Sequence, residues 1–466
     1  SLLEQEEQAA ATSIFHKAAE LATTKADQVK ALYLAAETEF ERGNYTSAAM
    51  IYQNIADNYS ESKWAGTARF KQAQARYKTG LFANAAMIYK QYIEENPRSD
   101  LKPRATLERG ISLRKAGDYQ EAQKLLESFA GAHPESTLTA TALKEAFQAA
   151  KAAGDTEAAL NYLSVIITKF SDSSLYKFAL YNRIHLNFEL GRYDKAVKFA
   201  YGFLEKYPDL SLSADVRLWL GDSFSHQGRP EKSEKFYLDV YREHPKMIQA
   251  HRGLLEAARG AYQQQKYDVA RKWLDALLEE YADKMDGALR ARAELLYGNI
   301  LAQEAEFEEA RSRFRECSER AADKRLRFIA KGRMADMYYS QGNPEQLQEA
   351  LNLYAELANS KEVPADIREM ASYKLGKTCE KQGKRQTAVE IYLDVFYQYQ
   401  SDVDAGNIRD WYYYARSGYD AARLLKKQDH RRAALDIYER LEKSAIPTSK
   451  EAAAKAEDLR KQLKES

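Results

Sequence analysis

The stretch GNYTSAAMIYQNIADNYSES at residues 43–62 decides the fold, because the chain repeats its pattern at a constant distance. GLFANAAMIYKQYIEENPRS follows at 80–99 and GDYQEAQKLLESFAGAHPES at 117–136, so each copy begins 37 residues after the last. A period of roughly 20–50 residues is typical of solenoids, in which one unit cannot cover its own apolar face and stacks on its neighbours. The sequence therefore predicts a tandem of similar units and no separate catalytic domain.

A glycine begins each copy and marks a turn between two helices. Glycine just after a helix accepts the left-handed conformation that ends the helix. The series keeps its step of 37 residues through Gln265 and then becomes less regular. The expected turn positions are Gly43, Gly80, Gly117, Gly154, Gly191, Gly228, Gln265, Ala305, Gly342, Gly383 and Gln428.

Small residues flank these turns and predict close packing of two helices. Five residues after the turn the residue is usually alanine, as at Ala48, Ala85, Ala122 and Ala433. Small residues on both sides of a tight turn let two helices approach as an antiparallel hairpin. Large residues one helical turn further on, such as Tyr52, are expected to fill the seam between hairpins. The residues expected to cap the next helices are Ser62, Ser99, Ser136 and Ser173.

The predicted fold is all-α, a right-handed superhelical solenoid of about eleven helical hairpins. Residues 1–25 are expected to form a partial repeat, 26–280 seven regular repeats, 281–448 four irregular repeats, and 449–466 a C-terminal capping helix. The partial repeat is inferred from Ala11, Phe15 and Ala18, which lie one period before Ala48, Tyr52 and Ile55. We expect the parent chain to extend beyond Ser1.

Composition argues against several classes of function. The 70 basic and 69 acidic residues leave a formal charge of +1, which gives no electrostatic reason to expect nucleic acid or an anionic membrane as a partner. No apolar run approaches the ~20 residues that span a bilayer. Cys317 and Cys379 predict neither a disulfide nor a metal cluster, and no HExxH, phosphate-binding or GxSxG motif is present. We therefore expect no enzyme activity, no cofactor and no metal.

The repeat resembles the tetratricopeptide repeat. The likeness is fullest in LWLGDSFSHQGRPEKSEKFYLDVYREHP at 218–245, which departs from the family at Pro230 and Ser233 and matches it at Leu220, Gly221, Phe224, Gly228, Tyr237 and Pro245. The family's unit has 34 residues, whereas this chain keeps 37. EENPRSDLKPRATLERGISL at 94–113 and EKYPDLSLSADVRLWLGDSF at 205–224 are similar to bacterial cell-envelope members, namely the outer-membrane assembly lipoproteins and the periplasmic Tol–Pal-associated protein.

The resemblance implies a non-catalytic scaffold that binds a partner protein or peptide in a concave groove lined by the first helix of each hairpin. It also implies a bacterial cell envelope, either the periplasm or a lipid anchor, with the cytoplasm as the alternative. Aromatic rings beside arginine suit a peptide groove, although burial against adjacent repeats explains the same residues equally well. The predicted binding residues are Tyr33, Phe70, Tyr77, Arg114, Phe178, Tyr181, His185, Arg252, Arg259, Tyr262, Tyr339 and Tyr373.

A second patch is predicted at Trp411, Tyr412, Tyr413 and Tyr414, after the longest spacing between repeats. Four adjacent aromatics cannot all lie on one side of a helix, so some are expected to be exposed for a partner or for self-association. The alternative is that the preceding loop covers them. The alternative functions are a self-assembling structural scaffold and the interaction region of a larger multidomain protein.

Overall fold

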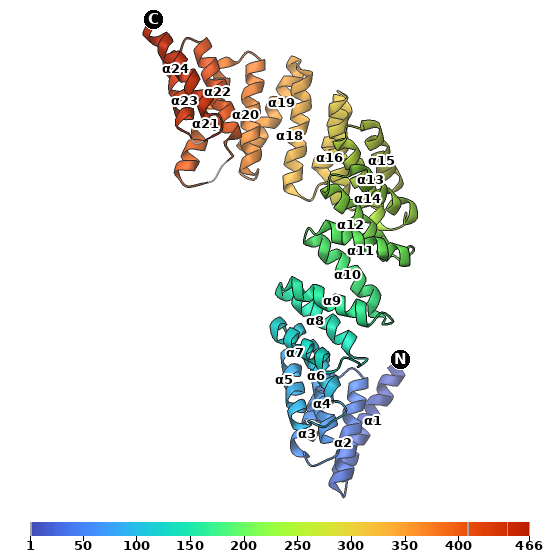
Figure 1. Ribbon diagram of the computed structural model, residues 1–466. Coiled ribbons are helices and arrows are strands. Elements are labelled where there is room, and N and C mark those ends of the chain that lie inside the picture. Colours follow the sequence, from blue (N-terminus) through green and yellow to red (C-terminus); the bar gives the residue numbers. More distant parts are fainter. Residues whose placement is uncertain (1, 408–409, 445, 466) are drawn as a thin grey trace. The chain divides into compact units, whose positions relative to one another are not determined.

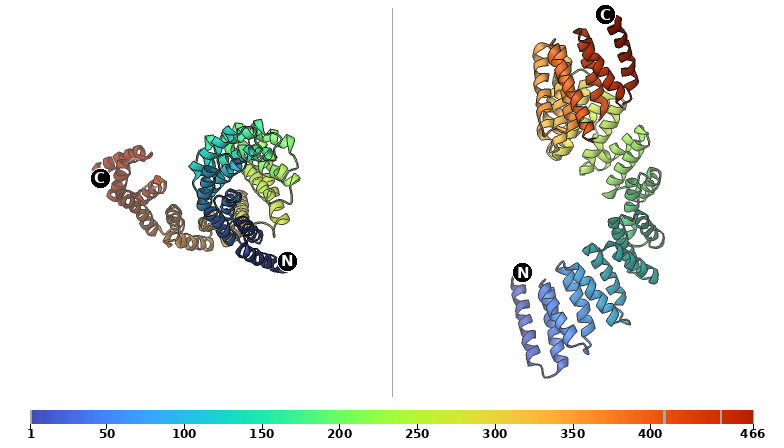
Figure 2. Two further views of the ribbon diagram at one scale, coloured as in Figure 1. Left: turned by 90° about the horizontal axis from the view of Figure 1, so that it is seen from below. Right: turned by 90° about the vertical axis from the view of Figure 1, so that its left-hand side faces the viewer.

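The computed structural model describes residues 2–407, 410–444 and 446–465. Over these ranges it contains 24 α-helices and no strand (Figure 1). The chain divides into two compact units, unit 1 at residues 1–227 and unit 2 at residues 228–466. Consecutive helices pack against one another throughout each unit, which confirms the expected all-α solenoid of stacked hairpins (Figure 2).

Unit 1 holds twelve helices in its described part. Their bounds are α1 Leu2–Leu21, α2 Lys25–Glu41, α3 Tyr45–Asn58, α4 Ala65–Lys78, α5 Phe82–Glu95, α6 Lys102–Ala116, α7 Tyr119–Ala132, α8 Thr139–Ala153, α9 Thr156–Lys169, α10 Leu175–Glu189, α11 Tyr193–Lys206 and α12 Leu212–His226. The even-numbered helices are the first helices of the hairpins, and the odd-numbered helices from α3 onward are the second helices.

The same alternation continues in unit 2. Its helices, within the described residues, are α13 Pro230–Glu243, α14 Ile248–Gln263, α15 Tyr267–Glu280, α16 Gly287–Gln303, α17 Phe307–Arg320, α18 Lys324–Gln341, α19 Pro344–Asn359, α20 Ala365–Lys381, α21 Arg385–Asp404, α22 Trp411–Lys427, α23 Arg431–Lys443 and α24 Ser449–Glu465. The second helices α3 to α17 are each 14 residues long, whereas α21 has 20.

The predicted turns are left-handed, including two that lack glycine. All eight predicted turn glycines have positive φ, and so do Gln265 at 59° and Ala305 at 61°. The last turn lies at Asp429, with φ 64°, one residue beyond the predicted Gln428. The prediction of Ala433 as the small seam residue is therefore wrong as well, because Ala433 is exposed and Ala434 is fully buried.

Replacing Ala305 by glycine is expected to stabilise unit 2 by about 1 kcal/mol, because a Cβ atom is strained in the left-handed conformation. Chemical denaturation followed by circular dichroism measures the change. Gly383→Ala is the matched control: its φ is 80°, and no atom lies within 4 Å of the added Cβ, so the backbone term acts alone with the opposite sign. If the parent and the two variants unfold at the same denaturant concentration, the left-handed backbone at Ala305 is not strained.

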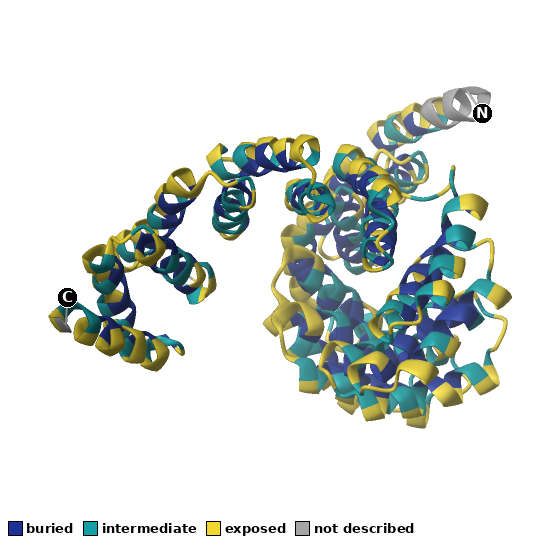
Figure 3. Cartoon of the chain, turned by 90° about the horizontal axis from the view of Figure 1, so that it is seen from above, coloured by how far each residue is buried: buried dark blue, intermediate teal, exposed yellow. Residues whose placement is uncertain are grey.

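The seam between hairpins is built as the sequence predicts. Ala48 and Ala85 are fully buried, as are Tyr52, Tyr89 and Leu126, and buried positions run between the stacked helices (Figure 3). Glycine replaces alanine at some of these seam positions, where even a methyl group would meet the facing side chain. A Cβ atom at Gly110, for example, would lie 2.5 Å from Leu126 Cδ2.

The four serines expected to cap helices do not do so. Each accepts a hydrogen bond from the backbone N–H two residues later, at 3.1–3.3 Å, and this closes a turn that precedes the helix. At α4, for instance, the N-cap is Trp64 and not Ser62. In the 37-residue unit, the connection from one hairpin to the next is long enough that the serine lies in this turn, before the next helix begins.

Candidate functional site

The first helices of neighbouring repeats contact one another and so form a continuous surface in each unit. In unit 1 these contacts join α6 to α8, α8 to α10, and α10 to α12; in unit 2 they join α14, α16, α18, α20 and α22 in sequence. We call the exposed side of these helices the first-helix face. This is the face on which the predicted binding residues were placed.

Two predicted binding residues lie in the core, so they are removed from the candidate site. Tyr33 is 9% exposed, with its ring centroid 4.5 Å from that of Trp64. Phe70 is 3% exposed and packs edge-on against Tyr89 and Tyr92 at 5.6 Å. Both rings also face the second helix of their own hairpin, since Tyr33 lies 5.8 Å from Tyr52 of α3 and both tyrosines that cover Phe70 belong to α5.

The other ten predicted residues reach the surface. Arg252 and Arg259 are exposed, and the remaining eight are partly exposed: Tyr77, Arg114, Phe178, Tyr181, His185, Tyr262, Tyr339 and Tyr373. Arg114 is already paired, because its guanidinium contacts the Glu145 carboxylate at 2.7 Å. These ten residues therefore remain candidates for binding, although they do not all lie in one cluster.

In unit 1 two of the predicted residues, Tyr181 and His185, form an aromatic cluster with Trp219 across α10 and α12. The His185 ring stacks on Trp219 at 4.6 Å and 25°, and Tyr181 lies 4.9 Å from the same indole. The Tyr181 hydroxyl donates to Asp215 at 3.0 Å, which fixes the ring. Burial lowers the pKa of His185, so its imidazole is neutral at pH 7 and serves as an aromatic surface.

Trp219 was missed by the sequence prediction, although the signal was present. It is one of four tryptophans and lies four residues after Asp215, which places both side chains on the same face of α12. Its side chain is partly exposed. An indole left partly in water between two other rings is well suited to contact a ligand.

The second predicted patch is smaller than expected. Tyr412 is 41% exposed, and Trp411 and Tyr413 are partly exposed. Tyr414 is a core residue with 1% exposure, because its ring stacks between Phe396 and Tyr399 at 4.7 and 4.2 Å. Its inclusion in a surface patch was wrong.

A recurrent triad links neighbouring repeats beneath the first-helix face. Glu37 on α2 accepts a hydrogen bond from Tyr52 on α3 at 2.5 Å and one from Lys71 on α4 at 3.1 Å. In unit 2, Asp336 on α18 contacts Tyr354 on α19 and Lys374 on α20 at 2.5 and 2.6 Å. Both carboxylates lie six residues before their turn, and both lysines lie nine residues before the next.

Burial opposes ionisation of Glu37, but hydrogen bonds from Tyr52 and Lys71 outweigh it and lower the pKa of the carboxyl. Because this pKa is lower in the folded chain, ionised Glu37 stabilises the fold above the unfolded value of about 4.3. That contribution is lost as the pH falls through the folded pKa. The triad at Glu37 is therefore an acid-sensitive connection between its two repeats.

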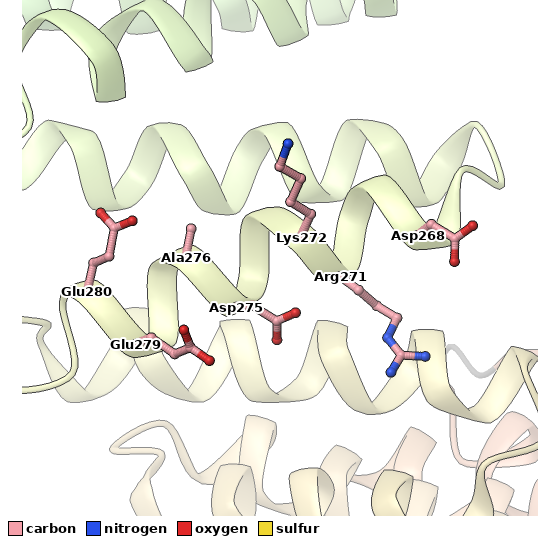
Figure 4. A pocket seen from close by; sticks show the side chains of 7 residues that line it. All are labelled: Asp268, Arg271, Lys272, Asp275, Ala276, Glu279 and Glu280. Atoms are coloured by element: carbon pink, nitrogen blue, oxygen red, sulfur yellow. The ribbon is translucent and has the colours of Figure 1, made fainter.

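No second site is provided by the pocket on α15, or by metal-ligating residues or cysteines of the described chain. A pocket of about 490 Å³ is lined by seven residues that all come from α15, so it is an open surface of one helix and encloses nothing (Figure 4). Among the residues that the structure describes, no group of His, Cys, Asp and Glu could hold a metal ion. Both cysteines are buried and unpaired, and burial raises the pKa of each thiol.

The sequence comparisons agree with the repeat pattern. A tetratricopeptide-repeat family model matches residues 104–136, which confirms the resemblance drawn from the repeats. A family model described as an outer membrane lipoprotein matches residues 25–116. No curated protein matches the sequence. No helix in the described part of the chain combines the length and apolar character that a membrane crossing requires.

Solved structures that match this chain include two repeat proteins and RapI. A tetratricopeptide-repeat protein from Parabacteroides merdae is 19% identical, with a TM-score of 0.37 over 58% of this chain and 98% of that chain. The C-terminal part of a repeat protein from Cytophaga hutchinsonii is 14% identical, with a TM-score of 0.45 over 55% and 97%. The apo form of RapI is 11% identical, with a TM-score of 0.45 over 74% and 99%.

Proposed function

We propose that this protein is a scaffold that binds a segment of a partner protein along its first-helix face, within a bacterial cell-envelope assembly. The tetratricopeptide repeats support a role in protein interaction, and the match of residues 25–116 to an outer membrane lipoprotein model supports the envelope. All-helical repeat folds of this kind are typical of non-catalytic proteins, so binding is the proposed activity.

The observation that carries the proposal is the cluster of Tyr181, His185 and Trp219. These rings are held in place by one another and by Asp215, so little side-chain entropy is lost when a ligand covers them. Partly exposed aromatic residues supply large apolar area and a polar edge, which is the composition of binding hot spots. An extended or helical segment lying across α10 and α12 would cover all three rings.

A peptide selection tests this proposal. The full chain is used to select from a displayed library of random peptides about twelve residues long, and the enriched peptides are measured by fluorescence anisotropy. Trp219→Ala with Tyr181→Ala is expected to weaken binding about 30-fold, the loss of roughly 2 kcal/mol that defines a hot spot.

The matched control is Tyr201→Ala, which removes a tyrosine that is 46% exposed on the second helix α11. Circular dichroism establishes that each variant is folded. If the double variant binds the selected peptides as tightly as the parent, or if no peptide is enriched, the proposed site is wrong.

Self-association is a second candidate function, and exposed apolar residues on one side of α1 support it. Ile14 and Leu21 are 64% and 72% exposed, whereas Tyr52 of α3, which lies one period after Phe15 of α1, is fully buried. Ala11 and Phe15 lie along the same side of α1 and are only partly buried. Light scattering at rising protein concentration, with Ile14→Glu for comparison, separates a self-assembling scaffold from a monomeric one.

A further inference from the structure

The first-helix face of α18, α20 and α22 carries an excess of positive charge. We call this surface the cationic face and define it by six basic residues whose side chains contact a carboxylate or a ring on these three helices: Arg333, Lys374, Lys377, Lys381, Arg416 and Arg423. Against these six cations stand the carboxylates of Asp336, Glu380 and Asp420, which leaves three positive charges over. The whole chain has a formal charge of +1, so this surface concentrates a charge that the composition hides.

The three carboxylates are occupied within the protein. Asp336 is paired with Lys374 at 2.6 Å, and Arg423 donates two hydrogen bonds to Glu380 at 2.8 and 2.9 Å. Asp420 accepts from Arg423 at 2.8 Å. The acidic side chains are only 18–22% exposed, so the negative charge lies below the surface.

Two of the six cations lie over aromatic rings. Lys381 Nζ is 4.4 Å from the centroid of the Tyr339 ring, and the Arg416 guanidinium is 5.2 Å from that of Tyr412. Both cations are exposed. A ring orients a cation without neutralising it, so both charges stay available to an incoming anion.

We propose that the cationic face binds an acidic segment of a partner protein, whose carboxylates contact Lys381 and Arg416 and whose apolar groups pack on Tyr339 and Tyr412. The inference rests on the proposed function and names the chemistry of the partner. A peptide fits better than duplex nucleic acid, because protein–DNA sites typically neutralise about 6–10 phosphates and this face has three charges in excess.

Anisotropy with a defined probe tests the inference on the full chain. The probe is a fluorescein-labelled peptide about twelve residues long that alternates Glu with Leu and Ala, and its partner peptide has Gln in place of Glu. We expect the acidic peptide to bind, the Gln peptide to bind at least 10-fold more weakly, and added salt to weaken the acidic complex.

Lys381→Glu with Arg416→Glu is expected to weaken the acidic complex at least 10-fold, and Lys381→Gln with Arg416→Gln to give an intermediate loss. The matched control is Lys90→Glu with Lys124→Glu, which makes the same change of charge at exposed positions on α5 and α7 and is expected to leave binding unchanged. Thermal unfolding of each variant checks that the fold is retained.

Three results would overturn the inference: no binding of the acidic peptide by the parent, equal losses in the two charge-reversal variants, or tighter binding of duplex DNA or phosphatidylglycerol vesicles that the same substitutions abolish. The peptide selection at Trp219 in unit 1 is independent of this face. A successful selection there, with a failed test here, leaves the proposed function standing and removes only the acidic partner.

Discussion

Gly253→Ala is expected to destabilise unit 2 by about 3 kcal/mol, near the upper end of overpacking effects. Gly253 lies in α14 where that helix crosses α13, and a Cβ atom there would be 2.6 Å from the backbone oxygen of Tyr237 and 3.5 Å from its carbonyl carbon. A side chain could swing away from such a contact, but a helical carbonyl cannot. The two helices must therefore move apart, and the packing between them is lost.

Gly260→Ala is the matched control, because it makes the same substitution in the same helix. No atom lies within 4 Å of a Cβ added at Gly260, so only the better helix propensity of alanine acts, which stabilises by up to about 1 kcal/mol. Urea denaturation followed by circular dichroism gives both values. If the two variants shift in the same direction, the close approach of α13 and α14 is not what requires glycine at 253.

The fold could be predicted in detail because its decisive features are local and periodic. The register placed turns at Gln265 and Ala305, where no glycine signals them, and both have the expected left-handed backbone. The register failed by one residue at Asp429. There α21 is six residues longer than the standard second helix and ends at Asp404. The repeat period does not predict how such extra residues are divided between helix and loop.

The candidate site was less predictable, because exposure depends on what a neighbouring helix presents. Phe70 and Tyr181 occupy the same position, ten residues before their turns. Phe70 is covered by Tyr89 and Tyr92, whereas Tyr181 is turned outward by its hydrogen bond to Asp215. Sequence spacing shows which side of a helix a residue is on, but not how deep it lies.

The charge-bearing contacts between repeats were not predicted at all. Glu37 and Lys71 lie 34 residues apart, and Asp336 and Lys374 lie 38 apart, yet each pair joins adjacent first helices. Acidic and basic residues are so frequent in the sequence that no such pair stands out. The pairs can be recognised only in the structure, where each carboxylate also accepts a hydrogen bond from a buried tyrosine.

Asp336→Ala is expected to lower the stability of unit 2 by about 3 kcal/mol. The carboxylate accepts the Tyr354 hydroxyl and pairs with Lys374, and Tyr354 is 1% exposed. Its removal leaves a buried hydroxyl without an acceptor and a partly buried ammonium without a counter-charge, each worth about 1–3 kcal/mol. Asp336→Asn keeps an acceptor for the hydroxyl and should lose about half as much.

Asp394→Ala serves as the control, since it removes an exposed aspartate of α21 in the same unit and should change stability by no more than about 0.5 kcal/mol. A double-mutant cycle with Tyr354→Phe then isolates the shared hydrogen bond. Because the stranded hydroxyl is absent in the Phe background, Asp336→Ala should be about 1 kcal/mol less damaging there. Additive losses would mean that the hydrogen bond between Tyr354 and Asp336 contributes nothing measurable to stability.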